Sequence, residues 1–313
     1  MIPFLRRRLD EVVTVVFLLI VLVATLAHRP VFATAGGLLL AQLVLGSSAL
    51  LLLVLVPAAR FSRVASSLLH LLLDFAPAVV AVIGYVALHL LNAYAITQAL
   101  HIPFLDPAMM RADQFLFGQT PYLIFLHWGW SAPAFLRLMT ACYAIYPLTP
   151  MLVLGWFAFR RDRENFLLVR RTLMVSFYLG YCCYILLPVS GPLSMLPPAA
   201  PGFIESTTIY AFLEANFRYV GDCFPSLHTA NPWLMVWTGR RGFPRWLLLA
   251  SCLVCCGITL STMVLRLHYG VDVLAGLLWA FTIPALARLT LLATKPEQAL
   301  QTMTSSGAPA GVK

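Results

Sequence analysis

Residues 221–233 read GDCFPSLHTANPW, a polar island in a chain that is otherwise mostly apolar. Pro225 suits the first turn of a helix, because its missing N–H leaves no hydrogen bond unmade there. The free N–H groups and the positive dipole end of that turn attract an anion. His228 lies in the same turn, where it can give a proton to a leaving oxygen. The stretch therefore predicts a helix that opens on half of a phosphate-binding site.

A second polar island, STMVLRLHYGVDVLAG, covers residues 261–276. His268 follows His228 by the length of one membrane span, a basic turn (GRRGFPRW) and one span back. Both histidines are therefore expected at the same face. His268 and Asp272 are four residues apart, and if a helix has begun there they share one side of it. Asp272 can then hold the imidazole in one tautomer and orientation, as the partner of a nucleophile does.

The composition places the two islands in a membrane protein. The 313 residues are 61% hydrophobic and 11% charged, with a mean hydropathy of +0.87, whereas soluble domains are roughly 45–50% apolar. The net charge of +9 comes from short basic clusters between apolar runs, a pattern that orients spans. We therefore predict no nucleic-acid partner. The seven cysteines lie mostly in apolar runs, so CLVCC is a weak redox signal.

About 20 apolar residues are needed for each span, which predicts an all-α polytopic membrane helix bundle with about eight transmembrane helices. The predicted spans cover residues 12–28, 36–57, 68–96, 134–159, 169–187, 225–239, 246–264 and 270–292. We expect residues 1–62 to form an N-terminal transmembrane hairpin, residues 63–295 a catalytic six-helix membrane core, and residues 296–313 a disordered cytoplasmic tail. The first apolar run could instead be a signal peptide.

The arginines orient this bundle. Most basic residues fall in segments that share one side with the amino terminus, which by the positive-inside rule makes both termini cytoplasmic and both histidines extracytoplasmic. The long outer segment 99–133 predicts interfacial or re-entrant helices, and segment 188–224 begins with turn formers and then predicts a short amphipathic helix. The richness in Ala, Leu and Arg suggests a bacterial inner membrane.

The polar islands are also compatible with a metal site or with a transport pathway. His228, His268, Asp272 and Asp222 could hold a metal, but no third closely spaced ligand is present, so we predict neither metal nor cofactor. A transporter would need polar residues at the membrane midplane, whereas these gather near one face. Because ionisable groups within a membrane are unfavourable and commonly functional, the islands favour an enzyme site.

FPSLHTA and STMVLRLHYGVDVLAG resemble two motifs of the type-2 phosphatidic acid phosphatase superfamily, P-S-G-H and S-R-x5-H-x3-D. Pro225, Ser226 and His228 match the first of these, and Ser261, His268 and Asp272 match the second. Leu227 replaces the motif glycine and Thr262 the motif arginine. A further family motif, K-x6-R-P, is absent. The inositol phosphorylceramide synthase branch of this superfamily has similar motifs, with F-P-S-L-H in the first and S-T before H-Y-x-x-D in the second.

The resemblance implies a reaction. His268 would attack phosphorus and form a phosphohistidine, Asp272 would orient it, and His228 would protonate the leaving alcohol. A phosphoinositol-like headgroup would move from a glycerophospholipid to a lipid alcohol such as ceramide. With water as acceptor, the same site would be a lipid phosphate phosphatase acting on phosphatidate or a polyprenyl phosphate. Membrane lipids are the expected partners, and no obligate protein partner is inferred. Substrate or phosphate contacts are predicted from Ser226, Arg266, Ser261, Asp222, Asn231 and Arg218.

Overall fold

The computed structural model describes residues 9–27, 33, 37–38, 40–46, 63–195 and 219–292, with side chains omitted at 9–13, 63–73 and 286–292. These residues are helical and contain no strand, which confirms the predicted all-α class. A single parallel bridge joins Val189 to Asp222 in two loops. The predicted tail, the predicted amphipathic helix after residue 195, and Arg218 lie outside the described residues.

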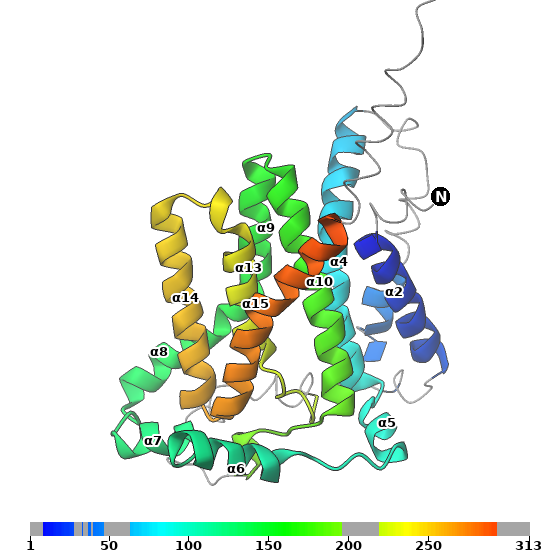
Figure 1. The fold of residues 1–313 in the computed structure, drawn as a ribbon. Coiled ribbons are helices and arrows are strands. Elements are labelled where there is room, and N and C mark those ends of the chain that lie inside the picture. The colour runs from blue at the N-terminus through cyan, green and yellow to red at the C-terminus, as the bar shows by residue number, and fades with distance from the viewer. Residues whose placement is uncertain are drawn as a thin grey trace, which may run out of the picture.

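The longer helices run along the bundle or lie across one of its ends (Figure 1). Their bounds are α2 Leu9–Ala27, α4 Arg63–Leu90, α5 Tyr94–Ala99, α6 Asp106–Phe117, α7 Pro121–His127, α8 Pro133–Ala144, α9 Thr149–Phe159, α10 Arg163–Leu186, α11 Pro192–Met195, α13 Leu227–Gly239, α14 Arg245–Val264 and α15 Gly270–Leu292. Short 3-10 turns, η3 Tyr146–Leu148 and η4 Arg240–Gly242, follow α8 and α13.

Helix α10 lies in the middle of the bundle. It packs against α13, α4, α9 and α15, and α13 packs in turn against α15 and α14. Helices α6 and α7 lie across one end of this bundle (Figure 1), where the sequence predicted interfacial helices. The N-terminal α2 packs on α4 and α10. The boundary at residue 62 between a hairpin and a catalytic core stays a prediction.

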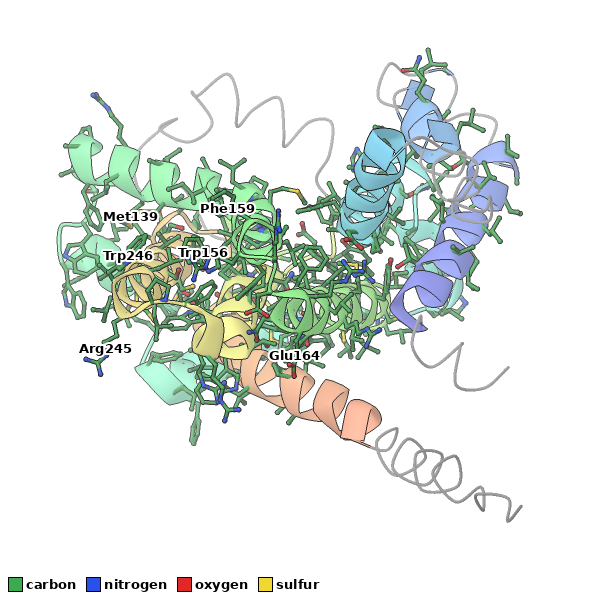
Figure 2. The ribbon with its side chains drawn as sticks, turned by 90° about the horizontal axis from the view of Figure 1, so that it is seen from above. Met139, Trp156, Phe159, Glu164, Arg245 and Trp246 are labelled. Atoms are coloured by element: carbon green, nitrogen blue, oxygen red, sulfur yellow. The ribbon has the colours of Figure 1, made fainter. Side chains whose placement is uncertain are left out.

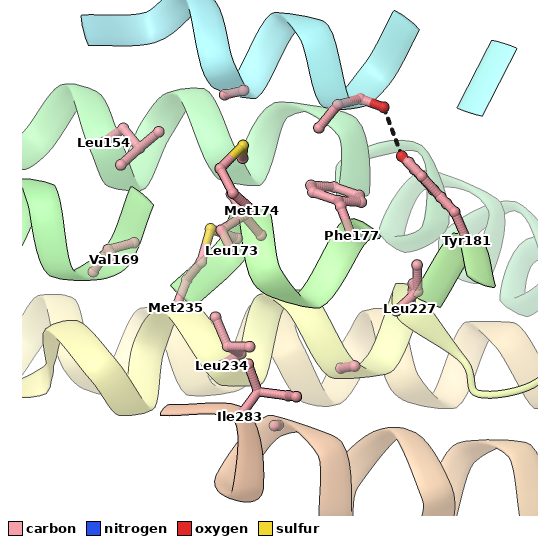
Figure 3. Packing of buried hydrophobic residues seen from close by; sticks show 14 of the residues in the cluster. Leu154, Val169, Leu173, Met174, Phe177, Tyr181, Leu227, Leu234, Met235 and Ile283 are labelled. Atoms are coloured by element: carbon pink, nitrogen blue, oxygen red, sulfur yellow. Dashed lines mark hydrogen bonds between the residues drawn. The ribbon is translucent and has the colours of Figure 1, made fainter. Parts of the chain in front are cut away.

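Close side-chain packing holds α10 to α13. Leu173 and Met174 of α10 and Leu234 and Met235 of α13 are fully buried in one cluster (Figure 3). Helix association within lipid depends on such van der Waals contact and on small residues that allow close approach. Gly180 provides one such place, because a Cβ there would lie 2.6 Å from the Leu227 side chain.

Three helices of the described part are long and apolar enough to cross a membrane, covering Pro133–Phe159, Arg163–Leu186 and Arg245–Val264. The first combines α8 and α9, which η3 interrupts. Shorter apolar helices cover Thr14–Ala27, Asp74–Leu90 and Gly270–Ala285. The chain is thus a helical membrane protein. The count of eight spans stays a prediction, because most of the second predicted span lies outside the described residues.

The connections at one end of the bundle are basic. The turn between α9 and α10 carries Arg160 and Arg161, and Arg163 begins α10. The turn between α13 and α14 carries Arg240 and Arg241. Figure 2 looks onto the molecule from above and labels Arg245, which begins α14, and Glu164 in the first turn of α10. At the other end α10 and α14 finish, and α13 and α15 begin.

Candidate functional site

His228 is positioned by a capped helix start. Helix α13 begins at Leu227, and Ser226 is its N-cap, with its hydroxyl oxygen accepting a hydrogen bond from the N–H of Thr229 at 3.3 Å. A serine is favoured here because its side chain satisfies an N–H that the helix leaves open. The N–H of Ser226 donates to the carbonyl of Asp272 at 3.2 Å. This bond ties the start of α13 to the start of α15.

His268 lies in the tight reversal between α14 and α15. The carbonyl of Thr262 accepts hydrogen bonds from the N–H groups of Leu267 at 2.9 Å and His268 at 3.0 Å, and Arg266 has a φ of 65°. Helix α15 begins at Gly270, so His268 precedes the helix instead of sharing a helical face with Asp272. The reversal, not the helical repeat, brings the two side chains together.

The structure brings His228, His268 and Asp272 into one group. His268 Nε2 lies 3.3 Å from His228 Nδ1, and His268 Nδ1 lies 3.6 Å from Asp272 Oδ2. The same carboxylate oxygen accepts a hydrogen bond from the N–H of Tyr269 at 3.0 Å. His268 is 2% exposed and Asp272 is fully buried. A carboxylate held beside one ring nitrogen directs the lone pair of the other, Nε2, toward His228.

Two tyrosines that the sequence reasoning missed surround the other side of His228. The hydroxyl of Tyr143 lies 3.0 Å from His228 Nε2, and the ring of Tyr146 packs with its centroid 4.3 Å from the imidazole. Both lie at the break between α8 and α9. The sequence signal is YAIY at 143–146, in the outer part of an apolar run, which no motif distinguishes from a membrane-interface aromatic pair.

Asn231 belongs to a buried chain of hydrogen bonds that ends on Tyr146. Trp279 donates to the Ser176 hydroxyl at 2.9 Å, Ser176 donates to Asn231 Oδ1 at 2.6 Å, and Asn231 Nδ2 donates to the Tyr146 hydroxyl at 3.3 Å. Asn231 is fully buried. Its amide therefore positions an aromatic ring against His228, and the substrate contact predicted for it stays a prediction.

Ser261 and Thr262 direct their hydroxyl groups into their own helix. Ser261 donates to the Ile258 carbonyl at 2.6 Å, and Thr262 donates to the Thr259 carbonyl at 2.8 Å. Both residues are fully buried near the end of α14. The structure thus gives the Ser261 hydroxyl a partner within α14, and its predicted phosphate contact also stays a prediction.

Two buried aspartates of α6 hold the loops around His268. Asp113 accepts hydrogen bonds from the N–H groups of Gly270 at 3.1 Å and Val271 at 2.9 Å. Asp106 accepts from the N–H groups of Ser190 and Gly191 at 3.0 and 2.9 Å, and from the Tyr269 hydroxyl at 3.1 Å. The two carboxylates are seven residues apart, which places them two helical turns apart on one face of α6. This spacing is visible in the sequence, but it lies outside the two polar islands.

The electrostatics of this face follow from burial. Burial raises the pKa of Asp113 above its ordinary value, and the N–H groups of Val271 and Gly270 act in the opposite direction. Burial, with the Asp106 carboxylate as second cause, raises the pKa of Tyr269. Asp113 places its negative charge at the N-terminus of α15, where the helix dipole favours it. This helix start is therefore occupied by the protein's own carboxylate.

Asp222 lies in the loop that leads to α13. Its Oδ2 accepts a hydrogen bond from the Tyr85 hydroxyl of α4 at 2.6 Å. The next residue, Cys223, donates its N–H to the Val189 carbonyl at 3.1 Å and has its sulfur 3.4 Å from the Leu267 carbonyl. Gly191 has a φ of 86°, and a Cβ there would lie 2.6 Å from both Cys223 Sγ and the Leu267 oxygen. A side chain at 191 would therefore separate the loops that carry the two histidines.

Arg266 is the buried cation closest in sequence to His268. It is 6% exposed, and its guanidinium lies 5.9 Å from the Tyr122 ring centroid. Arg170, the other buried arginine of the described part, pairs with Asp74 on α4, two turns from the basic end of α10. No group of three or more His, Cys, Asp or Glu residues in the described part could hold a metal ion.

Comparisons with known proteins identify a family. The family described as the PAP2 superfamily matches residues 107–286, a range that contains both polar islands and extends from α6 into α15. Comparisons with curated proteins and with solved structures give no significant match.

Proposed function

The chain belongs to the PAP2 superfamily, whose members are phosphatases and phosphotransferases, and from that premise we propose that it transfers a phosphorylated headgroup between membrane lipids. The reaction proceeds through a phosphohistidine on His268. One observation carries the proposal: His268 Nε2 faces His228 Nδ1 at 3.3 Å while its own Nδ1 faces Asp272. This pairing supplies a nucleophile with an orienting carboxylate and an adjacent acid.

Each of the three residues has a step. His268 attacks phosphorus and displaces the lipid alcohol, Asp272 stabilises the imidazole as its charge grows, and His228 protonates the leaving oxygen. An acceptor hydroxyl then attacks the phosphohistidine, with His228 taking its proton. Phosphoryl transfer needs the attacking and leaving atoms in line with phosphorus. Two nitrogens 3.3 Å apart cannot hold a phosphorus between them, so the His228 ring turns aside as the phosphoryl group enters.

Backbone groups supply part of the anion binding. The first-turn N–H groups of Leu227 and His228 have no acceptor within the described part of the chain, whereas those of Gly270 and Val271 are bound by Asp113. Open N–H groups at a helix start favour a phosphate. The α13 terminus is therefore the proposed cradle for the phosphoryl oxygens, with Ser226 as its cap and Arg266 as the nearby cation.

The charge balance favours a phosphodiester. Among the described residues, the carboxylates of Asp106, Asp113, Asp222 and Asp272 are buried, and Arg266 is the buried arginine closest in sequence to His268. The family's motif arginine is threonine in this chain. A diester carries one negative charge and a terminal phosphate up to two, so the diester needs fewer cations. A phospholipid that keeps its headgroup through the reaction, such as a phosphoinositol lipid, fits this balance.

The topology supports an extracytoplasmic site. The histidines lie at the end of the bundle opposite Arg160, Arg161, Arg240 and Arg241, and basic turns are retained on the cytoplasmic side. Helix α13 has 13 residues and is about 20 Å long, shorter than the roughly 30 Å hydrocarbon core. Its first turn is thus recessed from the surface, within reach of a lipid phosphate and of a lipid alcohol acceptor.

Product analysis tests the proposal. Purified protein in nanodiscs is incubated with headgroup-labelled phosphatidylinositol, with and without ceramide, and products are identified by mass spectrometry. Transfer predicts label on ceramide together with diacylglycerol. Free inositol phosphate with or without ceramide would indicate hydrolysis instead, and inorganic phosphate from phosphatidate would indicate the phosphatase alternative. Absence of turnover on every ester would refute the proposed enzyme.

A further inference from the structure

The two ring nitrogens of His228 face different partners. Nδ1 lies 3.3 Å from Nε2 of His268, and Nε2 lies 3.0 Å from the hydroxyl oxygen of Tyr143. A phosphorus atom bonded to His268 Nε2 lies on the Nδ1 side of the ring. The proton that reaches the leaving alcohol must therefore come from Nδ1, and Nε2 must keep its own proton throughout.

The protons carried by His268 and His228 determine what the Tyr143 hydroxyl can contribute. Attack requires a lone pair on His268 Nε2, which leaves the His268 proton on Nδ1, facing Asp272. An acid that can donate from Nδ1 and return to a neutral ring carries protons on both nitrogens. The Nε2–H of His228 then needs an acceptor, because an unsatisfied donor in a partly buried site is unfavourable. The Tyr143 oxygen lies at the right distance to accept it.

We propose that Tyr143 is the positioning residue of the acid–base histidine, accepting a hydrogen bond from Nε2–H of His228 so that proton exchange with the substrate is confined to Nδ1. The inference rests on the proposed function. In the first half-reaction His268 Nε2 forms the P–N bond as the P–O bond to the lipid alcohol breaks. The electron pair of that bond stays on the alcohol oxygen, which takes the Nδ1 proton and leaves His228 neutral.

The second half-reaction restores the site. The acceptor hydroxyl gives its proton to His228 Nδ1 as its oxygen forms a new P–O bond, and the P–N electron pair returns to His268 Nε2. His228 is again protonated on both nitrogens, and no proton is gained or lost over the cycle. The Nε2–H of His228 donates to Tyr143 in both halves. This bond is also the pivot about which the ring turns when a phosphoryl group enters.

The packing holds Tyr143 in this role. Its ring belongs to a cluster with Met139, Val264 and Leu265, which fixes it between α8 and the end of α14. Its centroid lies 4.9 Å from the His228 ring. Tyr146 packs against His228 as well, but its hydroxyl accepts from Asn231. Tyr143 is therefore the tyrosine whose hydroxyl contacts the acid–base imidazole.

Tyr143→Phe separates this role from packing, because it removes only the hydroxyl oxygen. We compare kcat/KM, which includes steps up to departure of the first leaving group, for phosphatidylinositol and for 4-nitrophenyl phosphoinositol. Protonation by a general acid contributes about 10²–10⁴-fold to loss of an alkyl alcohol. The variant is expected to lose about 10²-fold on the lipid and less than about threefold on the nitrophenyl ester, which departs without protonation. Tyr178→Phe, which removes a hydroxyl that donates to Thr14, is the matched control and is expected to behave as wild type.

The losses of kcat/KM on the two esters distinguish the role of Tyr143 from the proposed function. Equal losses on both esters, or no loss on either, would overturn the role of Tyr143 while leaving the proposed function intact. A wild type inactive on both esters would overturn the proposed function and this inference with it. A second readout uses the wild type alone: ¹⁵N chemical shifts of His228, assigned with a His228→Gln variant, should show a protonated Nε2. A neutral ring with its proton on Nδ1 would contradict the inference even where the Tyr143→Phe variant does not fold.

Discussion

Replacing Asp113 with alanine removes the carboxylate that accepts hydrogen bonds from the first N–H groups of α15. The Asp113 carboxylate accepts these bonds from Gly270 at 3.1 Å and from Val271 at 2.9 Å, and its side chain is fully buried. Hydrogen bonds to charged groups contribute about 1.5–3 kcal/mol each, and burial of the carboxylate offsets part of their sum. The expected loss of folding free energy is about 2–4 kcal/mol.

The assay is thermal unfolding in detergent, followed by tryptophan fluorescence. With about 2–4 °C for each kcal/mol, Asp113→Ala should lower Tm by about 5–15 °C, and Asp113→Asn, which keeps one acceptor oxygen, by about half as much. Gln114→Ala changes an exposed neighbour on the same helix and should stay within about 0.5 kcal/mol of wild type. A Tm for Asp113→Ala within about 1 °C of wild type would refute the reasoning.

The pH dependence of stability provides a second test of Asp113, because the direction of the change is predicted. Burial raises the pKa of Asp113 in the folded chain above its ordinary value of 3.8. The folded state therefore binds the proton more tightly than the unfolded state does. The resulting stability is fully present below pH 3.8 and is lost as pH rises through the pKa of the folded state. Asparagine does not titrate. The Tm difference between wild type and Asp113→Asn should therefore narrow from about pH 4 to pH 7, and a widening difference would contradict the assignment.

Two further substitutions test the site directly. Asp272→Asn should lower kcat by about 10³-fold or more, because an amide that donates to His268 Nδ1 selects the tautomer with a protonated Nε2. Product formation in nanodiscs measures this loss. A kcat within about threefold of wild type would exclude the orienting role of Asp272. Gly276→Ala should destabilise the protein by about 1–3 kcal/mol, because its Cβ would lie 2.6 Å from the carbonyl oxygen of Ser226, the N-cap of α13. Gly155→Ala is the control, since a Cβ at that position has no atom within 4 Å. Equal Tm values for the two variants would contradict the close packing of α15 against the start of α13.

Local signals in the sequence predicted the parts of the site that depend on helix starts. Pro225 predicted the start of α13 to within two residues: it was expected in the first turn, whereas the helix begins at Leu227 with Ser226 as its N-cap. The span–turn–span length between His228 and His268 predicted that they share one end of the bundle. These inferences succeed because helix starts and span length are local properties.

The contacts between distant segments could not be predicted in the same way. Tyr143 reaches His228 from a helix 85 residues away in sequence, and Asp113 reaches Gly270 across 157 residues, so no spacing rule connects them. The position of His268 before α15 depends on the reversal at Arg266, whose left-handed φ is uncommon for a residue with a side chain. The proposed preference for a phosphodiester rests on buried charges from segments far apart in the sequence, whereas the motifs suggested a substrate only through the family resemblance.

The central claim is that His268 carries the phosphorylated headgroup during turnover. The measurement is mass spectrometry of protein quenched in alkali during turnover of labelled phosphatidylinositol, conditions under which a phosphohistidine bond survives. The proposed chemistry predicts a phosphoinositol adduct on His268 that is absent from His268→Gln. In His228→Gln the adduct should still form from 4-nitrophenyl phosphoinositol, whose leaving group departs without protonation, and it should accumulate because its discharge lacks a base. An adduct on His228 or on another residue, or sustained turnover by His268→Gln, would contradict it.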